Sequence, residues 1–180
     1  MKPLPAGYAW LRDVPGLPRT ITEALALFGV TETPGAASTP EIMAWAKEVG
    51  LGRTYPNDGT AWCGLFAAVV AHRAGWPVVA GPLWARNWAN FGRSIEKADA
   101  SLGDVLVFSR DSGGHVGFYV GEDAGYFHVL GGNQSDKVCI TRIAKSRCIA
   151  VRRPKWKVAQ PAGVRKFKLA ATGAVSTNEA

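Results

Sequence analysis

The spacing of apolar residues changes near Gly103, and this change constrains the fold more than any other feature. Before Gly103, apolar residues recur at helical spacing in segments that begin near a proline or a capping residue and end at a glycine. After Gly103, short apolar runs alternate with turn residues, as strands do. This order predicts an α+β fold with N-terminal helices packed on a C-terminal antiparallel sheet. We expect helices over 18–29, 40–49, 62–74 and 84–91, and strands over 104–108, 116–120, 126–130, 137–143 and 149–151.

Cys63 lies where a loop meets the most apolar of these helices, over 62–74. Gly75 and Pro77 follow that helix, and its composition predicts that it is buried at the centre of the domain. The free amides and the dipole of a helix N-terminus favour a thiolate, and they can lower a cysteine pKa from about 8.5 towards the range of roughly 3.5 to 7.5. Cys63 is therefore a candidate nucleophile.

His115 is the candidate base, because it opens an apolar strand directly after two glycines. Each residue alone has a simpler interpretation. A free cysteine in an apolar helix is more often a small core residue, and a histidine at a strand end is often satisfied by a local carbonyl. A cysteine at a helix start together with a histidine at a later strand start favours acyl transfer.

Five short segments, taken in order, resemble the NlpC and CHAP cysteine peptidases, especially their small phage-borne, endolysin-like branch. The segments are 27–35, Trp62-Cys63, 103–105, 114–117 and 130–134, and the resemblance spans roughly residues 20–150. It implies a papain-like α+β fold and hydrolysis of an amide bond in bacterial peptidoglycan, with neither a metal nor an organic cofactor. It also implies that His115 takes the thiol proton, that the Cys63 thiolate attacks the carbonyl, and that amides at the helix start receive the oxyanion.

A third polar residue is needed to orient the imidazole, and two candidates follow His115 in the chain. NlpC-type members place a histidine on the next strand, as at His128, whereas CHAP-type members use an acidic residue or asparagine near its far end, as at Asn133. If the hairpin pairs Val120 with Tyr126, Asn133 shares the face of His115 and His128 does not. We therefore expect Asn133 as the third residue, with His128 as the alternative if a bulge alters the register.

Asp58 and Trp62 flank the nucleophile and are candidates for binding the substrate. The indole of Trp62 suits packing on a sugar or peptide face, and the carboxylate of Asp58 suits an amine of the peptide stem. The alternatives are a turn residue at Asp58 and a core aromatic residue at Trp62. Both interpretations stay open from the sequence.

The net charge of +7 is concentrated at the C-terminal end. The residues from Val151 onward contain seven lysines and arginines and a single acidic residue, Glu179, so this segment supplies +6. We therefore expect a hydrolase domain over 1–151 and a basic, flexible tail over 152–180. Such a tail suits contact with an anionic envelope polymer or membrane, or it serves solubility.

Other features limit the partners and the compartment. The apolar runs are much shorter than the roughly 20 residues of a membrane span, and the first residues lack the apolar core of a signal peptide. The three cysteines lack Cys-x-x-Cys spacing, which speaks against a metal site. We expect a monomer without a specific nucleic-acid partner. The endolysin resemblance implies synthesis in the bacterial host cytoplasm and action on the cell wall, in the periplasm, after release.

Two other functions stay open besides the hydrolase. An acyltransferase or toxin of related fold would use the same Cys63 and His115 pair on another acyl group. A non-catalytic cell-wall or nucleic-acid-binding module would act through the basic tail and would not need Cys63. For the hydrolase itself, the sequence does not separate an endopeptidase from an N-acetylmuramoyl-L-alanine amidase.

Overall fold

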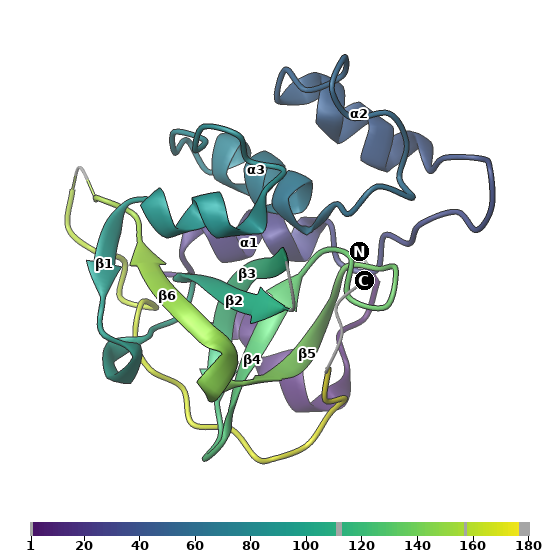
Figure 1. The fold of residues 1–180 in the computed structure, drawn as a ribbon. Helices are drawn as coiled ribbons and strands as arrows, with labels where there is room; N and C mark the ends of the chain where they lie inside the picture. The colour runs from purple at the N-terminus through teal and green to yellow at the C-terminus, as the bar shows by residue number, and fades with distance from the viewer. Residues whose placement is uncertain (1, 111–112, 157, 177–180) are drawn as a thin grey trace.

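The fold is α+β, as predicted, in a computed structural model that describes residues 2–110, 113–156 and 158–176 (Figure 1). The helices are η1 Ala6–Asp13, α1 Arg19–Ala26, α2 Pro40–Glu48, α3 Cys63–Arg73, η2 Ala85–Asn90, η3 Lys97–Asp99 and η4 Lys145–Arg147, where η marks a 3-10 helix. The strands are β1 Arg93–Ile95, β2 Val105–Arg110, β3 Gly113–Glu122, β4 Tyr126–Gly131, β5 Cys139–Ala144 and β6 Cys148–Arg153.

The six strands form one antiparallel sheet in the order β1-β6-β2-β3-β4-β5. Strands β2 to β5 are neighbours in the sheet in chain order, and β6 returns to pair with the free side of β2. The sequence reading did not predict β1, because this strand has three residues and none of them is buried. The segment predicted as a fourth helix is the short 3-10 helix η2.

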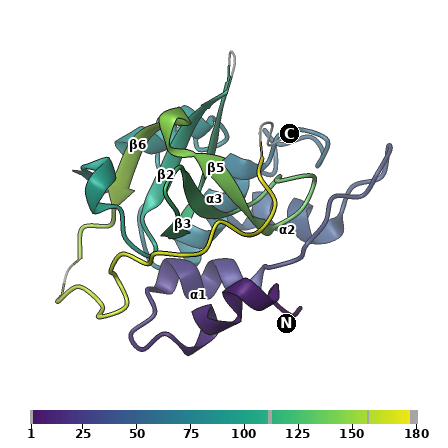
Figure 2. The same cartoon turned by 90° about the horizontal axis from the view of Figure 1, so that it is seen from below.

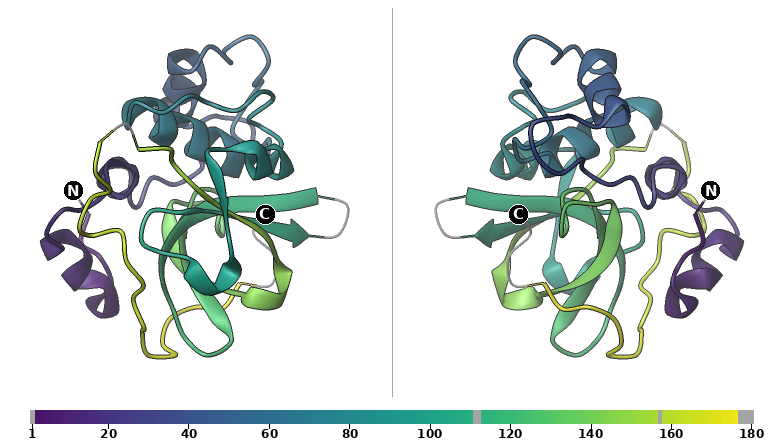
Figure 3. Two further views of the ribbon diagram at one scale, coloured as in Figure 1. Left: turned by 90° about the vertical axis from the view of Figure 1, so that its left-hand side faces the viewer. Right: turned by 90° about the vertical axis from the view of Figure 1, so that its right-hand side faces the viewer.

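The helix α3 lies at the centre of the domain, and nine of its residues are buried. It packs against β3 on one side and against α1 and α2 on the other, so the helices cover one face of the sheet (Figure 3). Val105 and Val107 of β2 point into this layer, whereas Leu106 and Phe108 point into a second core on the opposite face. Successive side chains of β2 therefore lie alternately in the two cores, as expected for a strand that is buried on both faces.

The C-terminal segment, which the sequence predicts as a flexible arm, is laid across the domain by specific contacts (Figure 2). Phe167 stacks on Trp10 of η1 with ring centroids 4.7 Å apart, and Lys168 pairs with Glu122 of β3. Arg142 of β5 exchanges backbone hydrogen bonds with Ala174 and Ser176. Residues 158–176 thus connect η1 with the edge of the sheet.

Two of the arginines that the sequence places in the basic tail, Arg152 and Arg153, make hydrogen bonds within the domain. Arg153 donates to both carboxylate oxygens of the buried Asp104, at 2.7 and 2.8 Å, and Asp104 also accepts the N–H of Ser101 at 2.8 Å. Arg152 donates to the carbonyl oxygens of Phe91 and Gly92. These two arginines therefore hold β6 to its surroundings.

Asp123 generates a prediction about acid stability. Burial raises the pKa of this carboxyl, but hydrogen bonds from Arg142, Gly125, His128 and Tyr126 outweigh burial and lower the pKa to about 2. Asp123 should therefore stabilise the fold above pH 4, and this contribution of about 2 kcal/mol should disappear as the pH falls from 4 to 2. Urea unfolding at several pH values should show the wild type losing its advantage over Asp123→Asn in that window. A difference in unfolding free energy that does not change with pH would contradict this assignment.

Candidate functional site

Cys63 is the first residue of α3, and the sheet covers it. The backbone N–H groups of Val116 and Gly64 lie close enough to its sulfur to favour the thiolate and so to lower the thiol pKa. Val116 directly follows His115 on β3, so the packing of α3 on β3 sets the sulfur beside the backbone of the candidate base. The helix-on-sheet layer thus brings Cys63 close to the backbone that follows His115, 52 positions later in the sequence.

The pKa of the Cys63 thiol is raised, whereas the sequence predicted a lowered value. Burial raises the pKa of this thiol above its ordinary value, and the opposing effects of the amides and of the Arg110 charge are smaller. The prediction of a lowered pKa is therefore wrong for the free protein, because the helix N-terminus lies under the sheet instead of facing water. The resting group is a thiol, and a base must remove its proton before attack.

His115 lies near the start of β3, opposite Phe108 of β2, and is buried. Its Nε2 atom is 3.1 Å from Oε1 of Gln134. Gly131 lies against this contact, since a side-chain carbon at this position would come within 3.1 Å of the imidazole Nε2. A side-chain carbon on the next residue, Gly132, would come within 2.7 Å of the ring of Trp62. The chain after β4 therefore passes between the histidine and the residue before Cys63.

Gln134 determines which nitrogen of His115 carries the proton. The side-chain nitrogen of Gln134 donates to the carbonyl oxygens of Val129 and Cys139, at 3.2 and 2.6 Å. This arrangement fixes the amide so that its oxygen faces His115, and an amide oxygen only accepts hydrogen bonds. The Nε2 atom of His115 therefore carries the hydrogen, and Nδ1 is left with the lone pair that a general base needs.

The loop that presents Gln134 has an unusual backbone. Asn133, Ser135 and Asp136 have φ values of 54°, 53° and 58°, and they are all of the non-glycine residues with positive φ in the described part of the chain. Such residues are disfavoured by of order 1 kcal/mol each and persist where the surroundings hold them. The surroundings here are backbone hydrogen bonds from residues 29–32 to residues 136–138. Backbone strain in this protein thus coincides with the candidate site.

The two third-residue candidates from the sequence occupy different surroundings. Asn133 is buried in the same loop, next to Gln134. Both ring nitrogens of His128 are engaged elsewhere, Nδ1 with the hydroxyl of Tyr8 at 2.7 Å and Nε2 with Asp123 at 3.0 Å. The role of Asn133 stays a prediction, while the contact at the imidazole of His115 comes from Gln134.

The hairpin register differs from the one assumed in the sequence analysis. Phe118 pairs with Leu130, and a bulge lies between Tyr119 and Gly121, so the assumed pairing of Val120 with Tyr126 is wrong. The sequence reasoning therefore missed Gln134. The available signal was its place in the segment 130–134, which carries part of the family resemblance.

Asp58 and Trp62, the predicted substrate contacts, are buried and have partners within the protein. The carboxylate of Asp58 accepts the N–H groups of Thr33 and Thr39, at 3.2 and 2.7 Å, and so anchors the loop before α2. The indole of Trp62 donates to Glu32 at 2.9 Å. Contacts of these two residues with substrate stay predictions, and the structure gives both a structural role.

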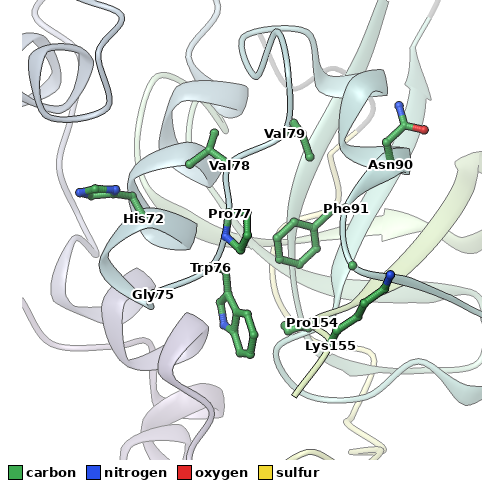
Figure 4. A pocket seen from close by; sticks show the side chains of 11 residues that line it. His72, Gly75, Trp76, Pro77, Val78, Val79, Asn90, Phe91, Pro154 and Lys155 are labelled. Carbon is green, nitrogen blue, oxygen red and sulfur yellow. The ribbon is translucent and has the colours of Figure 1, made fainter. Parts of the chain in front are cut away.

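A cavity lies away from this site, at the opposite end of α3 (Figure 4). Its volume is about 710 Å³, and its lining includes Trp76, Pro77, Phe91 and Lys155. The last residue of α3, Arg73, lies ten positions after Cys63, a span of about 15 Å along the helix. This cavity is therefore not the place where the thiol reacts.

Two searches of the described residues gave negative results. No cluster of three or more His, Cys, Asp or Glu side chains in the described ranges has the geometry to hold a metal ion. Among the helices formed by those residues, none has the length and apolar character needed to cross a membrane.

Comparison with known families gives one match. Residues 54–133 match the family model described as the CHAP domain. The match includes Cys63 and His115, and it ends at Asn133, one residue before Gln134. No curated protein matches the chain.

The protonation of His115 provides a direct test of this geometry. Two-bond ¹H–¹⁵N correlation spectra of the neutral protein should show the Nε2–H form of His115 as the dominant tautomer. Gln134→Ala removes the acceptor, so a mixture of both tautomers is expected in that variant, whereas Asn133→Ala should leave the spectrum unchanged. A dominant Nδ1–H form in the unmodified protein would refute the assignment.

Proposed function

We propose that this protein cleaves an amide bond of the peptidoglycan peptide stem through Cys63. Residues 54–133 match the family model of the CHAP domain, whose members are typically cysteine- and histidine-dependent peptidoglycan hydrolases. The observation that carries the proposal is the meeting of α3 and β3. It places a buried thiol beside the backbone of β3 at His115, and Gln134 leaves Nδ1 of that histidine as an acceptor.

The reaction begins with transfer of the Cys63 proton to Nδ1 of His115. The sulfur forms a bond with the carbonyl carbon of the substrate, and the carbonyl electrons move to oxygen. Backbone N–H groups at the start of α3, including that of Cys63, would receive this oxyanion. The imidazolium formed is stabilised through Nε2–H by its hydrogen bond to Gln134.

The second half of the reaction returns the protein to its starting state. The carbon–nitrogen bond breaks as the imidazolium protonates the leaving amine, and a thioester to Cys63 is left. Water then gives one proton to Nδ1 and attacks the thioester carbon. The carbon–sulfur bond breaks, the product leaves as a carboxylic acid, and the thiol is restored.

The buried position of Cys63 is compatible with this sequence of steps. Burial raises the pKa of the Cys63 thiol because it disfavours the charged thiolate, so the free site favours the thiol. The oxyanion then develops where little water competes for the amide hydrogens. The site therefore acts by general-base removal of the proton instead of by a preformed thiolate.

The biological setting follows from the resemblance and is part of the proposal. The resemblance implies an endolysin role, with release from the host cytoplasm before the wall is attacked. The basic residues that remain on the surface after Arg152 and Arg153 are used internally are the candidates for envelope contact.

Loss of the nucleophile is the first test of the proposed function. The wild type should release soluble fragments from purified peptidoglycan, and Cys63→Ala should reduce the rate at least about 1,000-fold because no thioester forms. Mass spectra of the fragments identify the bond by its new termini, and so separate an amidase from an endopeptidase. Cys148→Ala, which removes a buried thiol from the second core, is the matched control. Equal release by wild type and Cys63→Ala would overturn the proposal and favour a binding module.

Gln134 should act as a positioning residue for His115. Gln134→Ala is expected to lower kcat about 10- to 100-fold with little change in KM, because the base spends less time in the correct tautomer and orientation. Gln134→Glu keeps an acceptor oxygen for His115 but replaces the donor to the carbonyl oxygens of Val129 and Cys139 with a second acceptor, so it should restore only a small part of the rate. If Asn133→Ala lowers kcat and Gln134→Ala does not, Asn133 is the third residue, as the sequence predicts.

A further inference from the structure

We infer that Trp84 forms a sugar-binding subsite beside Cys63, where a ring of the glycan strand stacks on its indole. This inference rests on the proposed function, since it assigns part of the same substrate to a second contact. Trp84 precedes η2 and takes no part in the proton transfers described above.

The position of Trp84 follows from its neighbours in the chain. A side-chain carbon on Gly64, the residue after Cys63, would come within 2.8 Å of the carbonyl oxygen of Leu83. A side-chain carbon on Gly114, the residue before His115, would come within 3.0 Å of the side chain of Arg86. The segment around Trp84 therefore touches the chain directly beside both the candidate nucleophile and the candidate base.

Trp84 is exposed although the other tryptophans of the chain are buried or half-buried. Its exposed fraction is 68%, the highest of the seven. A single exposed apolar residue is common on protein surfaces, but Trp84 belongs to a segment that touches the chain beside Cys63 and His115, and its indole offers a large flat face to a ligand. The combination of exposure and position separates Trp84 from the tryptophans that fill the core.

The backbone that carries Trp84 is firmly held. Its N–H donates to the carbonyl oxygen of Gly81 at 3.1 Å, and its own carbonyl accepts the N–H of Asn87 at 2.9 Å. Beneath it, the fully buried Trp88 donates through Nε1 to the carbonyl oxygen of Pro82 at 2.9 Å. A platform fixed in this way loses little conformational freedom when a ligand binds.

The stem peptide and the glycan strand of peptidoglycan differ in how well they can pack on an indole. The stem peptide carries short or charged side chains, whereas each pyranose of the glycan strand presents a flat face of C–H groups that can lie on an aromatic ring. Stacking leaves the sugar hydroxyls and N-acetyl groups directed outwards to water or to neighbouring polar groups. The subsite is therefore assigned to the glycan and not to the peptide.

The test measures binding in the absence of hydrolysis. The full chain with Cys63→Ala is titrated into labelled glycan strands from which the peptides have been removed, and binding is followed by fluorescence anisotropy. Adding Trp84→Ala should weaken binding at least 10-fold, while Trp84→Phe, which keeps a flat ring, should weaken it less than about threefold. Val158→Ala removes part of another highly exposed apolar side chain, with an exposed fraction of 79%, and should have no effect.

The possible results separate this inference from the proposed function. Equal binding by the Cys63→Ala protein and its Trp84→Ala derivative overturns the subsite, as does an absence of glycan binding by the Cys63→Ala protein. An effect of Trp84→Ala on free stem peptide instead of on glycan also overturns it. Failure of the wild type to release fragments from peptidoglycan rejects the hydrolase, and glycan binding through Trp84 would then identify a wall-binding surface.

Discussion

The packing of α3 against β3 is the contact on which the rest of the site depends. Apolar burial drives this contact, because α3 exposes almost no polar side chain over its first nine residues and the inner face of β3 is equally apolar. The contact also positions polar groups, because the start of the helix lies where the Cys63 sulfur is close to the N–H of Val116. The burial that positions Cys63 also raises the pKa of its thiol, so it disfavours the thiolate. In the proposed mechanism a base must therefore remove the thiol proton.

His115 and Gln134 form a short hydrogen-bonded network with the carbonyl oxygens of Val129 and Cys139. In the proposed mechanism His115 is the base, and Gln134 is held by two carbonyl oxygens so that its own oxygen faces the imidazole. Buried polar groups of this kind are stable only when each donor and acceptor has a partner, and that requirement specifies one tautomer. The strained loop 133–136 is tolerated because it places Gln134 in this network.

Much of this could be predicted from the sequence, for local reasons. The helix start at Cys63 and the strand that carries His115 follow from apolar spacing and from the glycines that bound the segments. The register of β3 with β4 could not be predicted, because it depends on a bulge after Tyr119 that no local pattern marks. Gln134 was missed for a related reason, since its orientation depends on three non-glycine residues in left-handed conformations that tertiary contacts impose. The contacts of residues 158–176 are equally non-local, and composition alone suggested a free arm.

The central claim is that Cys63 carries the substrate acyl group during turnover. Digestion of peptidoglycan fragments, stopped with acid in the first turnovers and followed by mass mapping of the protein, tests it most directly. We predict a mass increase on the peptide that contains Cys63, equal to the acyl part of the cleaved substrate and absent from the His115→Ala protein. An acyl group on another side chain, or full turnover after the Cys63 thiol has been alkylated, would contradict the account.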